Sequence, residues 1–154
     1  MSGKFETRLA EIGITLPEAV APAANYVPFV QVGDLVYVSG QISMADGQMI
    51  KGKLGNGMSV EDAYAAARTC GINLITQLKA ACGGDLDRLV RVVKLNGFVN
   101  ATQDFGDHPA VINGASDLMV EVFGDQGRHA RAAVGSSSLP FGVAVEVEGV
   151  FQIS

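Results

Sequence analysis

Three charged residues near the end of the chain have the types and spacing to do chemistry. Arg131 lies in a short segment of alternating polarity, and Glu146 and Glu148 alternate with valines in a second one. A guanidinium can hold a carboxylate through two parallel hydrogen bonds, and a nearby glutamate can orient or deprotonate a water molecule. These residue types predict a small polar site that binds an acid.

The two segments are expected to form an antiparallel hairpin, because a turn rich in serine, proline and glycine separates them. Strand side chains point to opposite faces in turn, so valines and glutamates of the second segment lie on different faces. The shortest sensible loop sets Ala132 opposite Val145, both towards the core. It also sets Arg131 opposite Glu146 on the other face, with their Cβ atoms about 5 Å apart.

Two interpretations of the Arg131 and Glu146 pair stay open. An exposed cross-strand salt bridge would be purely structural and worth at most about 1 kcal/mol. Alternatively, Arg131 binds a substrate carboxylate while Glu146 positions a water. Glu148 has the same strand parity as Glu146 and could serve an interface instead.

The common catalytic and metal-binding patterns HExxH, GxSxG, GxGxxG and paired CxxC are absent. His108, at an expected helix start, and His129, expected to be exposed, lack metal-ligand spacing. Whether His129 enters a site stays open. Cys70 and Cys82 lie on one expected helix, roughly 18 Å apart, too far for a disulfide. We therefore expect buried thiols and no metal site.

Hydrophobic periodicity predicts the elements that position these residues. They are a helix near residues 5–12, a hairpin with strands 29–32 and 35–39, a helix from Ser59 to Gly83-Gly84, a strand over 89–99, a helix from Asp107 to Phe123, and the terminal hairpin. Residues 44–58 are expected to form a glycine-rich loop with at most one edge strand. The order β-β-α-β-α-β-β predicts a two-layer α+β domain, a mixed β-sheet with two main helices on one face plus an N-terminal helical arm.

Length and composition bound the class of protein. The 154 residues are expected to form a single domain, residues 1–154, with an arm over 1–25 and a core over 26–154. Hydrophobic residues make up 48% and charged residues 18%, which favours an oligomer. The net charge of −5 argues against nucleic-acid binding. No stretch is long and apolar enough for a membrane span and no signal-like segment begins the sequence, so a cytoplasmic protein is expected.

Three stretches resemble the RidA family, also called the YjgF/YER057c/UK114 family. They are VGDLVYVSGQIS (32–43), FVNATQDF (98–105) and RAAVGSSSLPFGVAVEVEGV (131–150). The last is similar to the family's terminal signature of an arginine, Leu-Pro, and alternating hydrophobic residues with Glu-x-Glu. Over roughly residues 26–154, the resemblance implies a chorismate-mutase-like fold and a homotrimer with ligand clefts between subunits. Active members use no cofactor and hydrolyse reactive 2-imino acids, or their enamine tautomers, to 2-oxo acids and ammonia.

The resemblance also implies roles for matching residues. Arg131 corresponds to the carboxylate-binding arginine and Glu146 to the water-positioning glutamate. Gly40 corresponds to the backbone contact in Ser-Gly-Gln (39–41), and Asn113 to an asparagine on the second helix.

Two positions depart from the family pattern. Phe29 stands where the family has a pocket tyrosine, so it has no hydroxyl to hydrogen-bond substrate or water. Ala133 stands where many active members have a cysteine, and a backbone contact there would survive. The resemblance implies an imine deaminase, with a non-catalytic carboxylate-binding protein and an endoribonuclease or translation inhibitor as alternatives. The acidic balance argues against the last.

Overall fold

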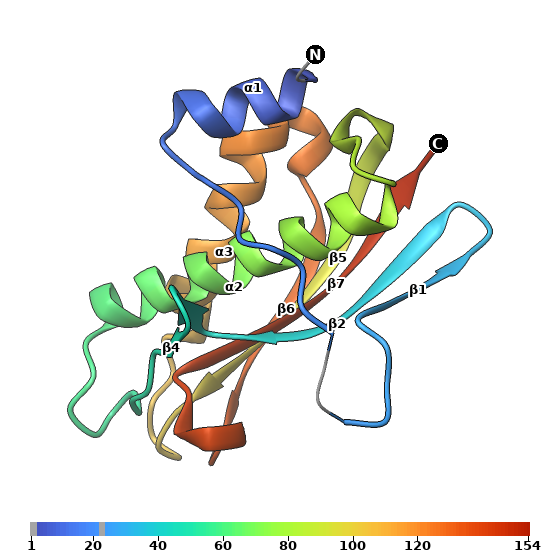
Figure 1. Ribbon diagram of the computed structural model, residues 1–154. Helices are drawn as coiled ribbons and strands as arrows, with labels where there is room; N and C mark the ends of the chain where they lie inside the picture. Colours follow the sequence, from blue (N-terminus) through green and yellow to red (C-terminus); the bar gives the residue numbers. More distant parts are fainter. Residues whose placement is uncertain (1–2, 22–23) are drawn as a thin grey trace.

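The computed structural model describes residues 3–21 and 24–154, which form a mixed sheet with two long helices packed on one face (Figure 1). The five-stranded sheet has the order β1-β2-β7-β5-β6. Its strands are β1 (Phe29–Val32), β2 (Leu35–Ile42), β5 (Leu89–Asn100), β6 (Ala130–Ser136) and β7 (Val145–Ile153). A small second sheet pairs β3 (Met44–Ala45) with β4 (Gln48–Met49), and the helices are α1 (Lys4–Glu11), α2 (Val60–Ala81) and α3 (His108–Phe123). The predicted α+β class and element order are confirmed, with the β3-β4 hairpin added.

The ends of the long helices follow from local chemistry. The Ser59 side chain accepts a hydrogen bond from the Asp62 backbone N–H at 3.1 Å and caps α2. Beyond the end of α2, Gly83 has a φ of +66°, a conformation that favours glycine. Pro109 lies in the first turn of α3, where its missing N–H costs nothing. The predicted starts of both helices are confirmed.

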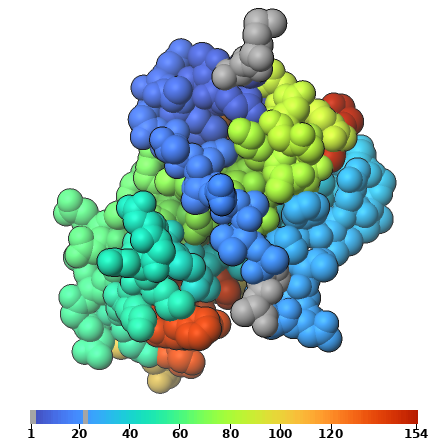
Figure 2. Space-filling view, viewed as in Figure 1, coloured from blue at the N-terminus to red at the C-terminus, as the bar shows by residue number. Residues whose placement is uncertain are grey.

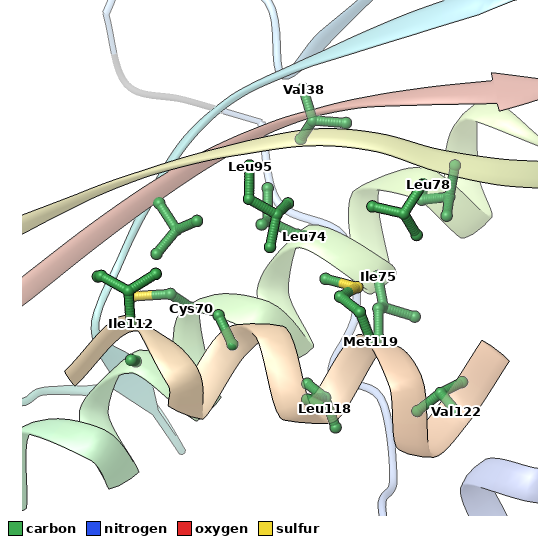
Figure 3. Packing of buried hydrophobic residues seen from close by; sticks show 14 of the residues in the cluster. Val38, Cys70, Leu74, Ile75, Leu78, Leu95, Ile112, Leu118, Met119 and Val122 are labelled. Atoms are coloured by element: carbon green, nitrogen blue, oxygen red, sulfur yellow. The ribbon is translucent and has the colours of Figure 1, made fainter. Parts of the chain in front are cut away.

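The core lies between the sheet and the two helices. Figure 3 shows apolar side chains of α2 and α3 filling this space, among them Leu74, Leu78 and Met119. The helices approach closely at Gly114, where an added Cβ would collide with the Tyr64 carbonyl. Cys70 and Cys82 are buried and not disulfide-bonded, as predicted. In the part of the chain that the structure describes, no helix has the length and apolarity to cross a bilayer.

The predicted terminal hairpin is wrong, because β5 lies between β6 and β7. β6 runs parallel to β5, with Arg131 beside Leu95, and β7 runs antiparallel to β5, with Glu146 beside Phe98. Helix α3 carries the chain back along the sheet between β5 and β6, and such a crossover makes the strands that it joins parallel.

The predicted faces of β6 are also reversed. Arg131 turns towards α3 and Ala133 packs against the core, whereas Val134 is 46% exposed. On β7, Val145 is fully buried, and strand alternation turns Glu146 to the opposite face. Arg131 and Glu146 of one chain therefore point to opposite faces of the sheet.

The described part of the N-terminal arm is attached to α3, to Asp87 and to α2. The ring of Phe5 packs edge-on against Phe123 of α3, with centroids 4.9 Å apart. Asp87 accepts hydrogen bonds from the first two backbone N–H groups of α1 at 3.0 and 3.3 Å. Further along, the buried Gln77 of α2 donates from Nε2 to the Val20 carbonyl at 3.2 Å. The arm consequently lies across α2, as its blue atoms show in Figure 2.

Candidate functional site

Arg131 is held by α3. Its Nη1 donates to Ser116 Oγ at 3.1 Å, and its Nη2 donates to the Pro109 carbonyl at 3.3 Å. None of the ion pairs formed among residues 3–21 and 24–154 includes Arg131. The salt-bridge interpretation of Arg131 with Glu146 is therefore wrong for one chain.

His129 completes a hydrogen-bonded chain behind Arg131. Its Nε2 lies 2.8 Å from Ser116 Oγ and its Nδ1 lies 2.6 Å from the Gly127 carbonyl. A carbonyl only accepts, so in the neutral ring Nδ1 carries the hydrogen and Nε2 accepts from the Ser116 hydroxyl. Burial lowers the pKa of His129; the hydrogen bond to Gly127 opposes this effect, and the charge of Arg131 adds to it. His129 is half-buried, so the expectation of an exposed side chain is wrong.

Asn113 belongs to the same region. It lies four residues after Pro109 and three before Ser116, a spacing that places all three on one face of α3. We call Pro109, Asn113, Ser116, His129 and Arg131 the arginine cluster. Sequence reasoning missed Ser116, although its position on the helical stripe of Asn113 was a signal that could have found it.

Gly40 and Glu146 lie together in a separate pocket of about 490 Å³ at the β2 edge of the sheet, which we call the edge pocket. β2 bulges between Val38 and Gln41, and a Cβ added at Gly40 would lie 3.1 Å from the Glu146 carboxyl group. Glycine at position 40 therefore leaves room for the Glu146 side chain. The pocket is also lined by the arm, by residues 44–49, by α2 and by the turn around residue 140, and several of these segments lie close together on the face seen in Figure 2.

The surroundings of Glu146 favour its protonated form. Burial raises the pKa of Glu146, and the charge of Glu148 raises it further. Glu148 is itself held by Asn96, whose Nδ2 donates to Glu148 Oε2 at 3.3 Å. A carboxylate with a raised pKa is a stronger base once it is ionised, which suits the activation of water.

Phe29 and Ala133 lie outside the edge pocket. Phe29 pairs with Val38 on β2 and packs against the core, and Ala133 packs against the core from β6. Their part in substrate binding stays a prediction. Tyr26, which the sequence reasoning passed over, lines the pocket and is 57% exposed. Phe29 stands where the family has a tyrosine, and Tyr26 is a tyrosine only three residues earlier in the sequence. This proximity was a signal that could have identified Tyr26.

One group of acids has the residue types of a metal site. Ligand atoms of Glu6, Asp85 and Asp87 lie within 4.8 Å of one another. Each carboxylate also accepts from backbone: Asp87 caps α1, Glu6 accepts from Leu86 N–H at 3.2 Å, and Asp85 accepts from Asp87 N–H at 3.0 Å. We interpret the group as structural caps.

The predicted site residues thus form two groups, one around Arg131 and Asn113 and one around Gly40 and Glu146. Two strand spacings of about 4.8 Å separate β6 from β7, and the two charged side chains point to opposite faces. A single chain does not bring them to one small molecule.

Comparison with known proteins places the chain among relatives of the same architecture. Protein TCP17 of Trypanosoma cruzi is 48% identical over 99% of this chain and 96% of that protein. A 2-iminobutanoate/2-iminopropanoate deaminase of Dermatophagoides farinae is 32% identical over 91% of this chain and 94% of that protein. The crystal structure of a putative endoribonuclease from Shewanella oneidensis is 36% identical, with a TM-score of 0.93 over 98% of this chain and 100% of that one.

The family model described as YjgF/chorismate mutase-like, putative endoribonuclease matches residues 6–148. The match takes in α3, β6 and the beginning of β7, and with them both groups of site residues. The chain belongs to the YjgF/chorismate mutase-like family.

Proposed function

We propose that this protein hydrolyses reactive 2-imino acids, or their enamine tautomers, to 2-oxo acids and ammonia. The observation that carries the proposal is Glu146, half-buried over Gly40 in the edge pocket with a raised pKa, where it can activate water. The deaminase among the relatives supports this reaction class.

The active site is formed by residues from two copies of the chain. Arg131 and Glu146 of one chain point to opposite faces, so the arginine cluster of one copy must meet the edge pocket of another. A cyclic homotrimer would close three such sites. Exposed apolar side chains favour association through the sheet: Val30, Val32, Tyr37 and Val134 are each at least 46% exposed.

The chemistry needs few groups because the imine carbon is already electrophilic. Arg131 binds the substrate carboxylate and fixes the position of the neighbouring carbon. Glu146 accepts a proton from water as the water oxygen bonds to that carbon and the C=N electrons move to nitrogen. That proton passes from Glu146 to the nitrogen and gives a carbinolamine. Glu146 then takes the proton of the carbinolamine hydroxyl and passes it to the amino group, so that the C–N bond breaks, ammonia leaves and the C=O bond forms. The reaction consumes one water molecule and requires no cofactor.

An assay that generates 2-iminobutanoate from threonine tests the arginine. We expect Arg131→Ala to remove nearly all activity. Arg128→Ala is the matched control, because Arg128 is exposed and pairs only with its neighbour Asp125 among the described residues. Wild-type turnover by Arg131→Ala, in an oligomer of wild-type mass, would rule out the assignment.

Subunit mixing tests the shared site. Arg131→Ala and Glu146→Gln should each be inactive, whereas coexpressed they should regain about a quarter of wild-type activity, since random assembly pairs an intact arginine with an intact glutamate at one site in four. A mixture that stays inactive while mixed oligomers are seen by native mass spectrometry contradicts a site made from two copies.

Two other functions have weaker support. Phe29 lacks the hydroxyl of the family tyrosine, which favours a protein that binds small acids without turnover; thermal stabilisation by 2-oxo acids with no imine hydrolysis would select it. Some relatives are named as endoribonucleases. Among the described residues, the charged side chains that line the edge pocket are the acids Glu18, Asp46 and Glu146. Their negative charges would repel the phosphates of RNA. RNA cleavage that copurifies with the protein and is lost in Arg131→Ala would select the nuclease.

A further inference from the structure

The edge pocket is larger than a short imino acid needs. Its volume is about 490 Å³. Even at the roughly 30 Å³ that a water molecule takes in the liquid, the seven non-hydrogen atoms of 2-iminobutanoate would fill less than half of it. Apolar atoms make up most of the accessible surface of the pocket. The second copy takes up part of the remaining space where its Arg131 meets the pocket, and the rest suits an apolar group of the substrate.

Two aromatic side chains in the lining are largely exposed. Tyr26 is 57% exposed and Phe141, in the turn Pro140–Gly142, is 68% exposed. Phe141 has a φ of +60°, a conformation that bulky residues rarely adopt. Strained residues of this kind gather at ligand contacts, and exposed aromatic rings are surfaces on which an apolar ligand gains much by burial.

The polar side chains that α2 presents to the pocket are already engaged. Asn73 Nδ2 donates to the Met44 carbonyl at 3.2 Å, and Thr76 Oγ1 donates to the Ile72 carbonyl at 2.9 Å. Gln77 Nε2 is taken up by the arm. Gln77 Oε1 has no partner among the described residues, but it is buried away from the solvent that a ligand would displace. This side of the pocket offers little to a polar substrate tail.

The charged residues of the pocket also disfavour substrates with an acidic side chain. Its charged lining residues within the described chain, Glu18, Asp46 and Glu146, are all acids. A substrate with a second carboxylate in its side chain would be repelled. The wall formed by the arm at Pro17 and Val20 is apolar and is fixed to α2 through Gln77.

We propose that the edge pocket selects 2-imino acids with bulky apolar or aromatic side chains, held between Tyr26, Phe141 and the arm at Val20. The proposal rests on the proposed function for the reacting end of the substrate. It assigns substrate choice to the N-terminal arm and to the turn at residue 141.

The proposed substrate preference is tested with a series of 2-imino acids that an amino-acid oxidase generates in situ. The imines derived from alanine, leucine, phenylalanine, lysine and glutamate are compared by kcat/KM. We expect kcat/KM for the imines derived from leucine and phenylalanine to be at least about tenfold higher than kcat/KM for the imine derived from alanine. The imine derived from glutamate should have the lowest kcat/KM. Tyr26→Ala and Phe141→Ala should each lower the ratio of bulky to small substrates about tenfold. Tyr26→Phe should keep it, because the ring and not the hydroxyl forms the wall.

The control and the contrary outcomes separate this proposal from the deaminase assignment. Val90→Ala changes an exposed apolar residue that does not line the pocket and should leave the ratio unchanged. Equal kcat/KM values for all the imines, or a higher value for the imine derived from lysine, would contradict the proposed substrate preference. Either result would still support the deaminase activity.

If the wild-type protein hydrolyses no imine, the proposed deaminase activity is wrong. The side-chain preference of the pocket is then tested by measuring the binding of stable 2-oxo acids with calorimetry. Tighter binding of phenylpyruvate than of pyruvate, lost in Phe141→Ala, supports the pocket. Equal binding, or none, overturns it.

Discussion

Ser116 Oγ accepts a hydrogen bond from Arg131 Nη1 at 3.1 Å, and the same hydroxyl lies 2.8 Å from His129 Nε2. The serine thus has its donor directed to the imidazole and a lone pair directed to the guanidinium. A planar guanidinium held from two sides presents its remaining N–H groups in a fixed direction.

Replacing Ser116 should therefore weaken substrate binding. We expect Ser116→Ala to raise KM about tenfold with a smaller change in kcat, because a hydrogen bond to a charged group is lost. Steady-state kinetics with one imine measures the split. Ser116→Thr keeps the hydroxyl and should stay near the wild-type KM; an unchanged KM in Ser116→Ala would show that the contact does not position Arg131.

Gly40 should be sensitive to a single added carbon. Its Cβ would lie 3.1 Å from the Glu146 carboxyl group, so Gly40→Ala should displace that group and lower kcat about tenfold. Gly106→Ala is the matched control, since no atom lies within 4 Å of its added Cβ and its φ is not positive. Equal kinetics in the two variants would contradict the placement of Glu146 in the reaction.

The pH dependence of activity should follow Glu146 and its neighbour. The base must be ionised, so activity rises with pH through the raised pKa of Glu146. Glu148→Gln removes one cause of the raised value, so the acid limb of kcat/KM should move to lower pH. Asp125→Asn, a highly exposed acid that does not line the pocket, should leave the profile unchanged. An acid limb that stays in place in Glu148→Gln would assign the limb to another group.

Stability should depend on pH in opposite ways through His129 and Glu146. The pKa of His129 is lowered from 6.5, so below that pH the unfolded chain binds the proton first and the folded state loses stability. The pKa of Glu146 is raised from 4.5, so its contribution is present below that pH and is lost as pH rises through the folded value.

Urea unfolding between about pH 4 and 8 measures both contributions. His129→Gln should gain relative to wild type as pH falls below 6.5, and Glu146→Gln should gain relative to wild type as pH rises. Parallel curves for a variant and the wild type would show that the group in question does not titrate differently on folding.

Much of the fold was accessible from the sequence because its signals are local. The turn Gly33-Asp34 between alternating segments predicts the first hairpin, and Ser59 with two following acids predicts the start of α2. These elements are confirmed because the residues that determine them lie within a few positions of one another.

The pairing of β6 was not accessible in the same way. Alternation along β6 is compatible with any neighbour, and small residues such as Ala132 and Ala133 do not mark which face is buried. The order strand, helix, strand over β5, α3 and β6 is a signal for a parallel crossover, whereas the serine-rich turn that precedes β7 is a signal for a hairpin. Consequently the grouping of the residues expected at one site required the sheet order, which separates Arg131 from Glu146.

The hydrogen bond from Gln77 to Val20 ties the N-terminal arm to the C-terminal part of α2. A segment anchored in this way can exchange residues such as Val20 and Tyr26 without disturbing the arginine cluster or Glu146. Grafting the first 28 residues of one relative onto the body of another is thus a direct route to an altered preference among acids, with the reacting groups left intact.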